Sequence, residues 1–266
     1  MVSRLKLVGL ADILTMCNCL CGFLAIIAFL KFYPDITIGT GLIFLGIVFD
    51  GLDGAAARKF GTKHDFGRHL DSISDSFTFV LAPAFLVFVV FSKSILDEGF
   101  FNITTFSNHP INILVLFTVI FVICFGLKRL YIYTTRGYKL KTFLGLATPA
   151  LAFYIIVISH ILDPHRPENK YILIPYFSLI TIIIGSVLMD SRIKYPKIRG
   201  KLGAALALAI ILSLLSIEIQ KWFGVSSAEE IFFYYRILTF CGLGIVICYV
   251  FFSPLILILF KRDQPE

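Results

Sequence analysis

Apolar segments long enough to cross a bilayer are the feature that most restricts the fold of this 266-residue chain. A helix needs about 20 mostly apolar residues to span the hydrocarbon core of a membrane. Such segments occur eight times, at roughly 13–32, 37–57, 70–91, 111–127, 144–162, 171–189, 202–222 and 231–260. They are continuous rather than alternating, which indicates helices and not a β-barrel. We therefore predict an all-α, polytopic membrane helix bundle with about eight transmembrane helices.

The composition points to the same class of protein. Hydrophobic residues make up 58% of the chain and charged residues 15%, whereas soluble domains have about 45–50% and about 25%. A soluble globule and a disordered chain are both excluded on this basis. None of the connections is long enough for a separate soluble domain, so we expect a single integral membrane domain over residues 1–266.

The basic residues predict how the chain crosses the membrane. If the N-terminus is cytoplasmic, 18 of the 24 Lys and Arg residues fall on the cytoplasmic side and 5 on the other side, and Arg236 lies within the last apolar segment. Because cytoplasmic loops are rich in Lys and Arg, we expect both termini and the turn between the second and third segments to face the cytoplasm of a cell membrane. The net charge of +7 then comes from a cytoplasmic face that lies beside anionic lipid headgroups. No nucleic-acid partner is expected.

Four aspartates stand where the second and third apolar segments meet: Asp50 and Asp53, then Asp71 and Asp75. A carboxylate at the centre of a membrane helix costs about 2.5–3.5 kcal/mol, so such a cluster must be neutralised. At 100° per residue, each pair lies on one face of its helix. A short cytoplasmic turn joins the two helices, which allows these faces to meet.

The residue types of this acidic hairpin, residues 50–75, suit phosphate chemistry. Four carboxylates without Cys or His favour hard divalent cations, Mg²⁺ or Mn²⁺. Gly54, Ala57 and Gly67 share the acidic faces and leave room for a bulky ligand. Arg58 adds a guanidinium that can pair with a phosphate. Divalent cations and Arg around a phosphorus centre are typical of phosphoryl transfer.

The stretch from Asp50 to Asp75 resembles the signature of the CDP-alcohol phosphatidyltransferases, D-x-x-D-G-x-x-A-R-x(8)-G-x-x-x-D-x-x-x-D, and matches it at every position. The resemblance implies an enzyme that transfers a phosphatidyl-type group from a CDP-activated lipid to an alcohol and releases CMP. It also implies a homodimer and a six-helix catalytic core. We expect that core within residues 1–200 and two additional transmembrane helices within 201–266.

The resemblance also assigns roles within the hairpin. Asp50, Asp53 and Asp71 would hold one metal ion, and Asp50, Asp71 and Asp75 a second. Asp75 would also be the general base. The residues expected to contact the CDP-lipid are Gly54, Ala57, Arg58, Gly67, Thr15 and Asn18. For Thr15 and Asn18, which lie on the first helix, ordinary hydrogen bonding between helices is the alternative.

Three shorter stretches are similar to the phosphatidylserine synthase branch of that family. Residues 12–22 resemble its opening L-T-x-x-N-x-x-x-G helix. Residues 143–150 resemble F-x-G-L-P-x-P-A, with Ala147 in place of the first Pro, and residues 191–196 resemble S-x-I-R-Y-P, with Lys194 in place of Arg. Of the two arginines in the branch's R-L-A-R-F-N stretch, the corresponding residues 129–134 keep only the first, Arg129. The resemblance implies L-serine as the acceptor.

A serine acceptor carries a carboxylate that needs a nearby cation. The candidates are Arg129, Arg192 and Lys194, and we favour Lys194 because it occupies the Arg position of the last stretch. The donor lipid is CDP-diacylglycerol or CDP-archaeol, which the sequence does not distinguish. Alternatives are the same chemistry with glycerol phosphate or inositol phosphate as acceptor, a Mg²⁺-dependent intramembrane prenyltransferase, or a divalent-cation transporter.

Overall fold

The computed structural model describes residues 9–33, 35–60, 65–92, 110–136, 145–161 and 173–191, together with 193 and 244. The helices in these ranges are α1 (Leu10–Phe32), α2 (Thr37–Phe60), α3 (Asp65–Asp75), the π-helix η2 (Ser76–Leu81), α4 (Ala82–Phe91), α7 (Pro110–Arg136), α8 (Thr148–Ile161) and α9 (Leu173–Met189). The described ranges contain no strand, which confirms the all-α prediction. The two helices predicted within 201–266 lie outside the described residues.

The first six predicted membrane segments each correspond to a helix. Four helical stretches are long and apolar enough to span a membrane: Leu10–Phe32, Thr37–Ala57, Phe66–Phe91 and Pro110–Thr135. Thr148–His160 and Leu173–Met189 are apolar but shorter. The chain is therefore a polytopic helical membrane protein in the part that the structure describes.

The helix from Phe66 to Phe91 is continuous although it contains Pro83. In a regular α-helix a proline lacks one N–H and its ring clashes with the carbonyl four residues before it. Here the wider turn of η2 precedes the proline, and the Ala82 N–H bonds the Phe77 carbonyl five residues back. The π-helix thus accommodates Pro83 without ending the helix.

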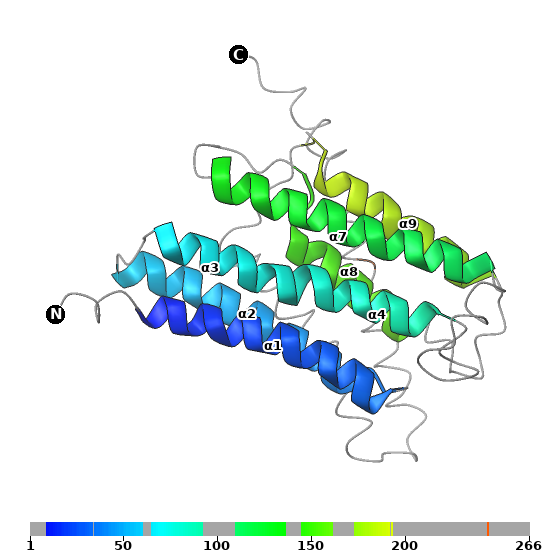
Figure 1. The fold of residues 1–266 in the computed structure, drawn as a ribbon, viewed down its shortest axis with the longest axis horizontal. Helices are drawn as coiled ribbons and strands as arrows, with labels where there is room; N and C mark the ends of the chain where they lie inside the picture. Colours follow the sequence, from blue (N-terminus) through cyan, green and yellow to red (C-terminus); the bar gives the residue numbers. More distant parts are fainter. Residues whose placement is uncertain are drawn as a thin grey trace.

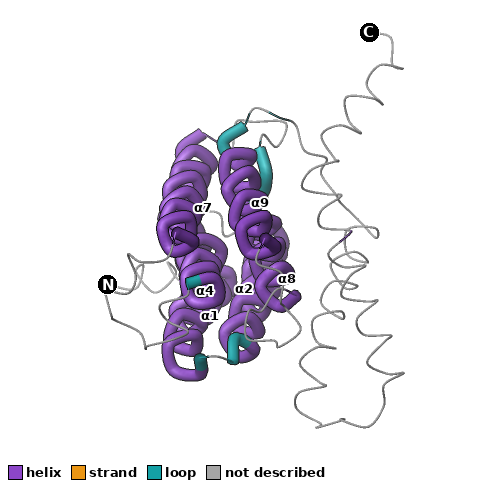
Figure 2. Tube along the Cα trace, turned by 90° about the vertical axis from the view of Figure 1, so that its right-hand side faces the viewer, coloured by secondary structure: helices purple, strands orange, loops and turns teal. Residues whose placement is uncertain are grey.

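This α3–η2–α4 helix is the centre of the bundle. Within its apolar window 61% of residues are buried, against 28–39% in the other three spans. Figure 2 shows α4 in the middle, with α1, α2, α7 and α8 around it. Its own fully buried side chains include Leu86 and Val87, and those in the same core from other helices include Phe29, Ile43, Val115 and Ile155.

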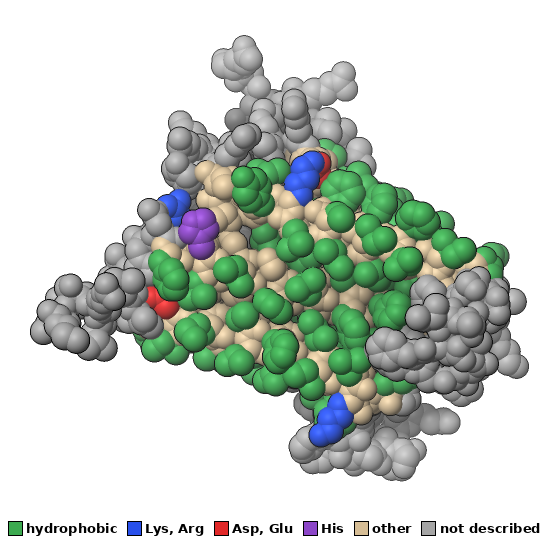
Figure 3. Space-filling model, in the orientation of Figure 1, with side chains coloured by type: hydrophobic (Ala, Val, Ile, Leu, Met, Phe, Trp, Pro, Cys, Tyr) green, Lys and Arg blue, Asp and Glu red, His purple; other side chains and the backbone are tan. Residues whose placement is uncertain are grey.

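The outer surface of the bundle is apolar along most of its length. Large hydrophobic side chains of α1 and α7 are about half exposed, among them Ile13, Leu20, Phe23, Ile113 and Phe117. Figure 3 shows hydrophobic side chains covering one face, with the coloured charged side chains toward its margins. Such a surface suits contact with lipid tails rather than water.

The ends of five helices meet at one end of the bundle. The start of α1, the turn side of α2 and α3, and the ends of α7 and α9 all lie toward the same side in Figure 1. The fold therefore places the acidic hairpin and the residues directly after α9, Asp190 and Ser191, at the same end, where the candidate site lies.

Candidate active site

Three aspartates of the acidic hairpin converge. Asp50 and Asp53 lie on the last turns of α2 and Asp71 lies on α3, and one carboxylate oxygen from each comes within 4.8 Å of the others. Asp53 is buried, whereas Asp50 and Asp71 are half-buried. Asp75, one turn beyond Asp71, is outside this group of three among the described residues.

The donor set of this cluster fits a hard divalent cation. All three groups offer carboxylate oxygens, and the cluster contains no Cys or His. Oxygen donors of this kind suit Mg²⁺ or Mn²⁺ better than Zn²⁺. The three negative charges lie close together at the end of a membrane helix bundle, where a bound cation would offset their repulsion.

Helix α1 supplies hydrogen-bond donors to two of the aspartates. The Thr15 hydroxyl donates to Asp53 Oδ2 over 2.6 Å, and Asn18 Nδ2 donates to Asp75 Oδ1 over 3.2 Å. Both side chains are buried. The sequence analysis selected Thr15 and Asn18 as contacts of the CDP-lipid, and the structure places them against the carboxylates.

Two further residues that the sequence analysis missed hold the central helix against α1. The Ser74 hydroxyl donates to the Thr15 carbonyl over 2.8 Å, and the Thr78 hydroxyl donates to the Asn18 carbonyl, also over 2.8 Å. The available signal was that Ser74 and Thr78 stand four residues apart, on one helical face, in the segment that carries Asp71 and Asp75.

The small residues of the hairpin lie beside the aspartates along the chain. Gly54 and Ala57 are half-buried on α2, and Gly67 is half-buried one turn before Asp71. Arg58 belongs to α2, but its side chain lies outside the described residues. The hairpin thus combines carboxylates with positions of little side-chain bulk.

A second polar group lies where α7, α8 and α9 meet, and we call it the α7–α9 junction: Lys128, Arg129, Tyr133, Gly145, Thr148 and Asp190. Arg129 is only 7% exposed. Its Nη1 donates to the Thr148 hydroxyl over 3.0 Å, and its guanidinium carbon lies 4.6 Å from the centre of the Tyr133 ring. A buried guanidinium held by a hydroxyl and a ring face has a defined orientation.

Backbone hydrogen bonds join α8 to the end of α9. The Gly145 N–H donates to the Ile193 carbonyl over 2.9 Å, and the Leu146 N–H donates to the Leu188 carbonyl over 3.1 Å. Gly145 has a φ of 73°, and a Cβ there would collide with the Met189 carbonyl oxygen. Gly145 and Leu146 belong to the stretch 143–150 and Ile193 belongs to the stretch 191–196, so the described residues of these two stretches are in contact here. Arg192 and Lys194 lie outside the described residues.

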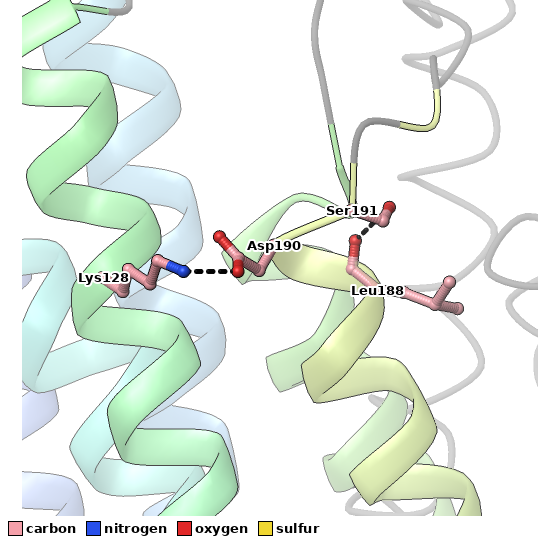
Figure 4. Close-up of polar contacts among 4 residues, drawn as sticks. All are labelled: Lys128, Leu188, Asp190 and Ser191. Atoms are coloured by element: carbon pink, nitrogen blue, oxygen red, sulfur yellow. Dashed lines mark hydrogen bonds and ion pairs between the residues drawn. The ribbon is translucent and has the colours of Figure 1, made fainter.

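An ion pair ties α7 to the end of α9. Lys128 Nζ lies 2.5 Å from Asp190 Oδ2, with the two side chains 53% and 30% exposed. Figure 4 shows this pair bridging the two helices, beside the Ser191 hydroxyl, which donates to the Leu188 carbonyl over 2.8 Å.

The hairpin and the junction touch through two hydroxyls. Ser72, the neighbour of Asp71, contacts Thr134, the neighbour of Tyr133. Each hydroxyl also lies within 3.1 Å of the backbone carbonyl four residues earlier in its own helix. Because a hydroxyl has a single hydrogen, one of the two donates to the other while the second donates to its own carbonyl. Helix α7 therefore connects the carboxylate cluster to the buried Arg129.

Comparison with known proteins identifies the family. The family model described as CDP-alcohol phosphatidyltransferase matches residues 8–188. A CDP-diacylglycerol–serine O-phosphatidyltransferase of Methanocaldococcus jannaschii is 34% identical over 79% of this chain and 88% of its own length. A protein of the same name from Bacillus subtilis is 32% identical over 69% of this chain and 87% of its own. An archaetidylserine synthase of Methanothermobacter thermautotrophicus is 32% identical over 75% and 74%.

The matched region contains the acidic hairpin, α7, α8 and all but the last residue of α9, whereas Asp190 of the α7–α9 junction lies just beyond it. The prenyltransferase and transporter alternatives are therefore set aside. An all-helical membrane bundle, a cluster of carboxylates at one end of it and a family match over most of the chain lead to one assignment: this protein belongs to the CDP-alcohol phosphatidyltransferase family.

Proposed function

We propose that this enzyme transfers the phosphatidyl or archaetidyl group of a CDP-activated lipid to the hydroxyl of L-serine and releases CMP. The observation that carries the proposal is the convergence of Asp50, Asp53 and Asp71 at one end of the bundle. The acceptor is inferred from relatives whose names specify serine.

The aspartates would hold the divalent cations. Asp50, Asp53 and Asp71 would bind one ion, and Asp50, Asp71 and Asp75 a second. Bound Mg²⁺ or Mn²⁺ would offset the negative charge of the diphosphate and of the departing CMP. The cluster supports the first of these sites more directly, because its three oxygens already lie within 4.8 Å of one another.

Asp75 would act as the general base. Its carboxylate would accept the proton of the serine hydroxyl as the serine oxygen attacks the lipid-linked phosphorus. The bond from that phosphorus to the oxygen of CMP would then break, so that CMP leaves with the electron pair. The Asn18 amide holds one oxygen of Asp75, which leaves the other oxygen for the serine proton.

The CDP-lipid would lie along the hairpin. Gly54, Ala57 and Gly67 present little side-chain bulk and would admit the nucleotide close to the backbone, and Arg58 would pair with a phosphate. The sequence also predicts contacts between the CDP-lipid and Thr15 and Asn18, with hydrogen bonding between helices as the alternative role of these two residues.

The serine carboxylate would bind near the α7–α9 junction. Among the described residues, Arg129 is the cation best suited to bind this carboxylate, because it is buried and α7 links it to the hairpin. Arg192 and Lys194 follow α9 and complete the candidates. We expect Lys194→Ala to raise the KM for serine by roughly 10- to 100-fold with little change in the KM for the CDP-lipid.

The enzyme would work on the cytoplasmic side of a cell membrane, among its lipids, as a homodimer. The distribution of Lys and Arg supports this orientation. In intact cells, a thiol reagent that cannot cross the membrane should label Ser107→Cys and not Lys63→Cys. The reverse pattern would overturn the orientation.

The decisive experiment is an acceptor and donor screen. Purified protein in detergent is supplied with CDP-diacylglycerol or CDP-archaeol, and with serine, glycerol phosphate, inositol phosphate or no acceptor, and CMP release is measured. Release that depends on serine supports the proposal. Release only with a phosphorylated alcohol would replace serine as acceptor and leave the family assignment intact.

A further inference from the structure

The first helix is joined to the acidic hairpin by a repeated pattern of contacts. Thr15 donates through its side chain to Asp53 and accepts through its carbonyl from Ser74. Three residues later, Asn18 donates through its side chain to Asp75 and accepts through its carbonyl from Thr78. Thr15 thus connects Asp53 of α2 to the central helix, and Asn18 holds the central helix at two points, one of them the Asp75 carboxylate.

These contacts are shielded from solvent. Asn18, Ser74 and Thr78 have no exposed surface, and Thr15 is 5% exposed. A hydrogen bond to a charged acceptor in such surroundings is stronger and more directional than one at the surface. The arrangement is therefore suited to holding a carboxylate in one orientation.

The chemistry of the groups determines which atom points at each carboxylate. An ionised carboxylate only accepts hydrogen bonds, so the amide of Asn18 must present Nδ2 to Asp75. Its Oδ1 then faces α2, where a Cβ on Gly46 would come within 2.9 Å of it. This buried Oδ1 has no hydrogen-bond partner among the described residues. Gly46 thus leaves room for the one amide orientation that serves Asp75.

Close packing keeps α1 at the required distance. A Cβ on Gly22 would lie 2.6 Å from the Thr78 nitrogen and hydroxyl. Because Gly22 has no side chain, α1 can approach the π-helix closely enough for Thr78 to reach the Asn18 carbonyl. The approach of the two backbones therefore sets where Thr15 and Asn18 stand.

We propose that Thr15 and Asn18 are positioning residues of the metal site: each fixes one carboxylate, Asp53 or Asp75, in the orientation that binds the divalent cation. The inference rests on the proposed function, in which these aspartates bind Mg²⁺ or Mn²⁺. It differs from a nucleotide-contact role, which would place the two side chains on the CDP moiety.

The experiment measures Mn²⁺ binding without any substrate. The full chain is purified in detergent and titrated with Mn²⁺, and the free ion is followed by electron paramagnetic resonance. Thr15→Val and Asn18→Leu remove the donors at nearly constant volume. Both should weaken Mn²⁺ binding by about 10- to 100-fold, the range seen when outer contacts of metal ligands are lost.

Thr118 is the matched control. Like Thr15, it is buried, and its hydroxyl donates to the Leu114 carbonyl one turn earlier. The Thr15 hydroxyl also lies 2.9 Å from such a carbonyl, that of Ala11, but its single hydrogen points to Asp53 Oδ2, which is closer at 2.6 Å. Among the described residues, no hydrogen bond joins the Thr118 hydroxyl to a carboxylate. Thr118→Val should leave the Mn²⁺ dissociation constant within about twofold of the wild type. Thr15→Ser keeps the hydroxyl and should bind Mn²⁺ like the wild type. This variant also tests the inference if Thr15→Val does not fold, because weak Mn²⁺ binding by folded Thr15→Ser would overturn it.

A second readout separates positioning from nucleotide contact. If Thr15→Val and Asn18→Leu bind Mn²⁺ normally but raise the KM for the CDP-lipid, the inference is overturned and the nucleotide-contact role stands. Failure of the wild-type chain to bind Mn²⁺ would overturn the metal site itself. A change of acceptor from serine to another alcohol would contradict the proposed function and leave this inference standing.

Discussion

The acidic hairpin and the α7–α9 junction are assembled in different ways. The aspartates of the hairpin come from one segment, residues 50–75, and their spacing on two connected helices is enough to bring three of them together. The junction joins distant segments: Arg129 to Thr148, Lys128 to Asp190, and Gly145 to Ile193. In the proposed function, the hairpin would define the type of reaction, and the junction, which depends on how three helices pack, would select the acceptor.

The largest effect should follow from breaking the hairpin. Asp71→Asn removes a charge from the cluster while preserving its shape, and CMP release should fall by at least about 10³-fold, since several kcal/mol of charge stabilisation is lost. Asp35→Asn is the control, because Asp35 lies between α1 and α2 and bonds the Thr37 N–H. Equal activity of the two variants would contradict the role of the hairpin.

Breaking the junction at its buried cation should have a smaller effect. Arg129→Gln removes a guanidinium that bonds Thr148 and stacks on Tyr133, and we expect kcat/KM for the acceptor to fall by roughly 10- to 100-fold. Lys128→Gln, at the adjacent but exposed position, should change it by less than about threefold. Steady-state assays with serine varied at saturating CDP-lipid make the measurement.

The backbone of the junction can be tested through Gly145. Its φ of 73° and its contact with the Met189 carbonyl exclude a Cβ, so Gly145→Ala should lower the free energy of unfolding by roughly 1–3 kcal/mol. Gly41→Ala is the control, since a Cβ there meets nothing within 4 Å and alanine favours a helix. Thermal unfolding in detergent compares them, and equal melting temperatures would contradict the proposed strain.

The smallest effect is expected for the ion pair between Lys128 and Asp190. Both side chains are partly exposed, and pairs of this kind contribute at most about 1 kcal/mol. A double-mutant cycle with Lys128→Gln and Asp190→Asn should give a coupling energy below that value, and it should shrink as salt is raised. A larger coupling that is insensitive to salt would show that the pair is a central element of the junction.

The same contrast explains what the sequence could predict. Apolar length located the first six helices, and helical spacing anticipated the meeting of Asp50, Asp53 and Asp71, because both are local properties of the chain. The Arg129–Thr148 and Gly145–Ile193 contacts depend on packing between distant segments, which spacing does not encode. The roles of Ser74 and Thr78 were missed for a related reason: the position of a hydroxyl on its own helix does not reveal which carbonyl of another helix it will meet.

The π-helix between Asp75 and Ala82 sets the rotation of the aspartates relative to α4. Its wider turns hold more residues than the turns of an α-helix, so each residue of Ser76–Leu81 advances the helix by less than the about 100° of a regular α-helix. If the same six residues formed a regular α-helix, Asp71 and Asp75 would be rotated relative to α4 by up to about 100°, while the hydropathy profile and the number of membrane segments would stay the same. The wide turn is thus itself a determinant of the direction in which the carboxylates face.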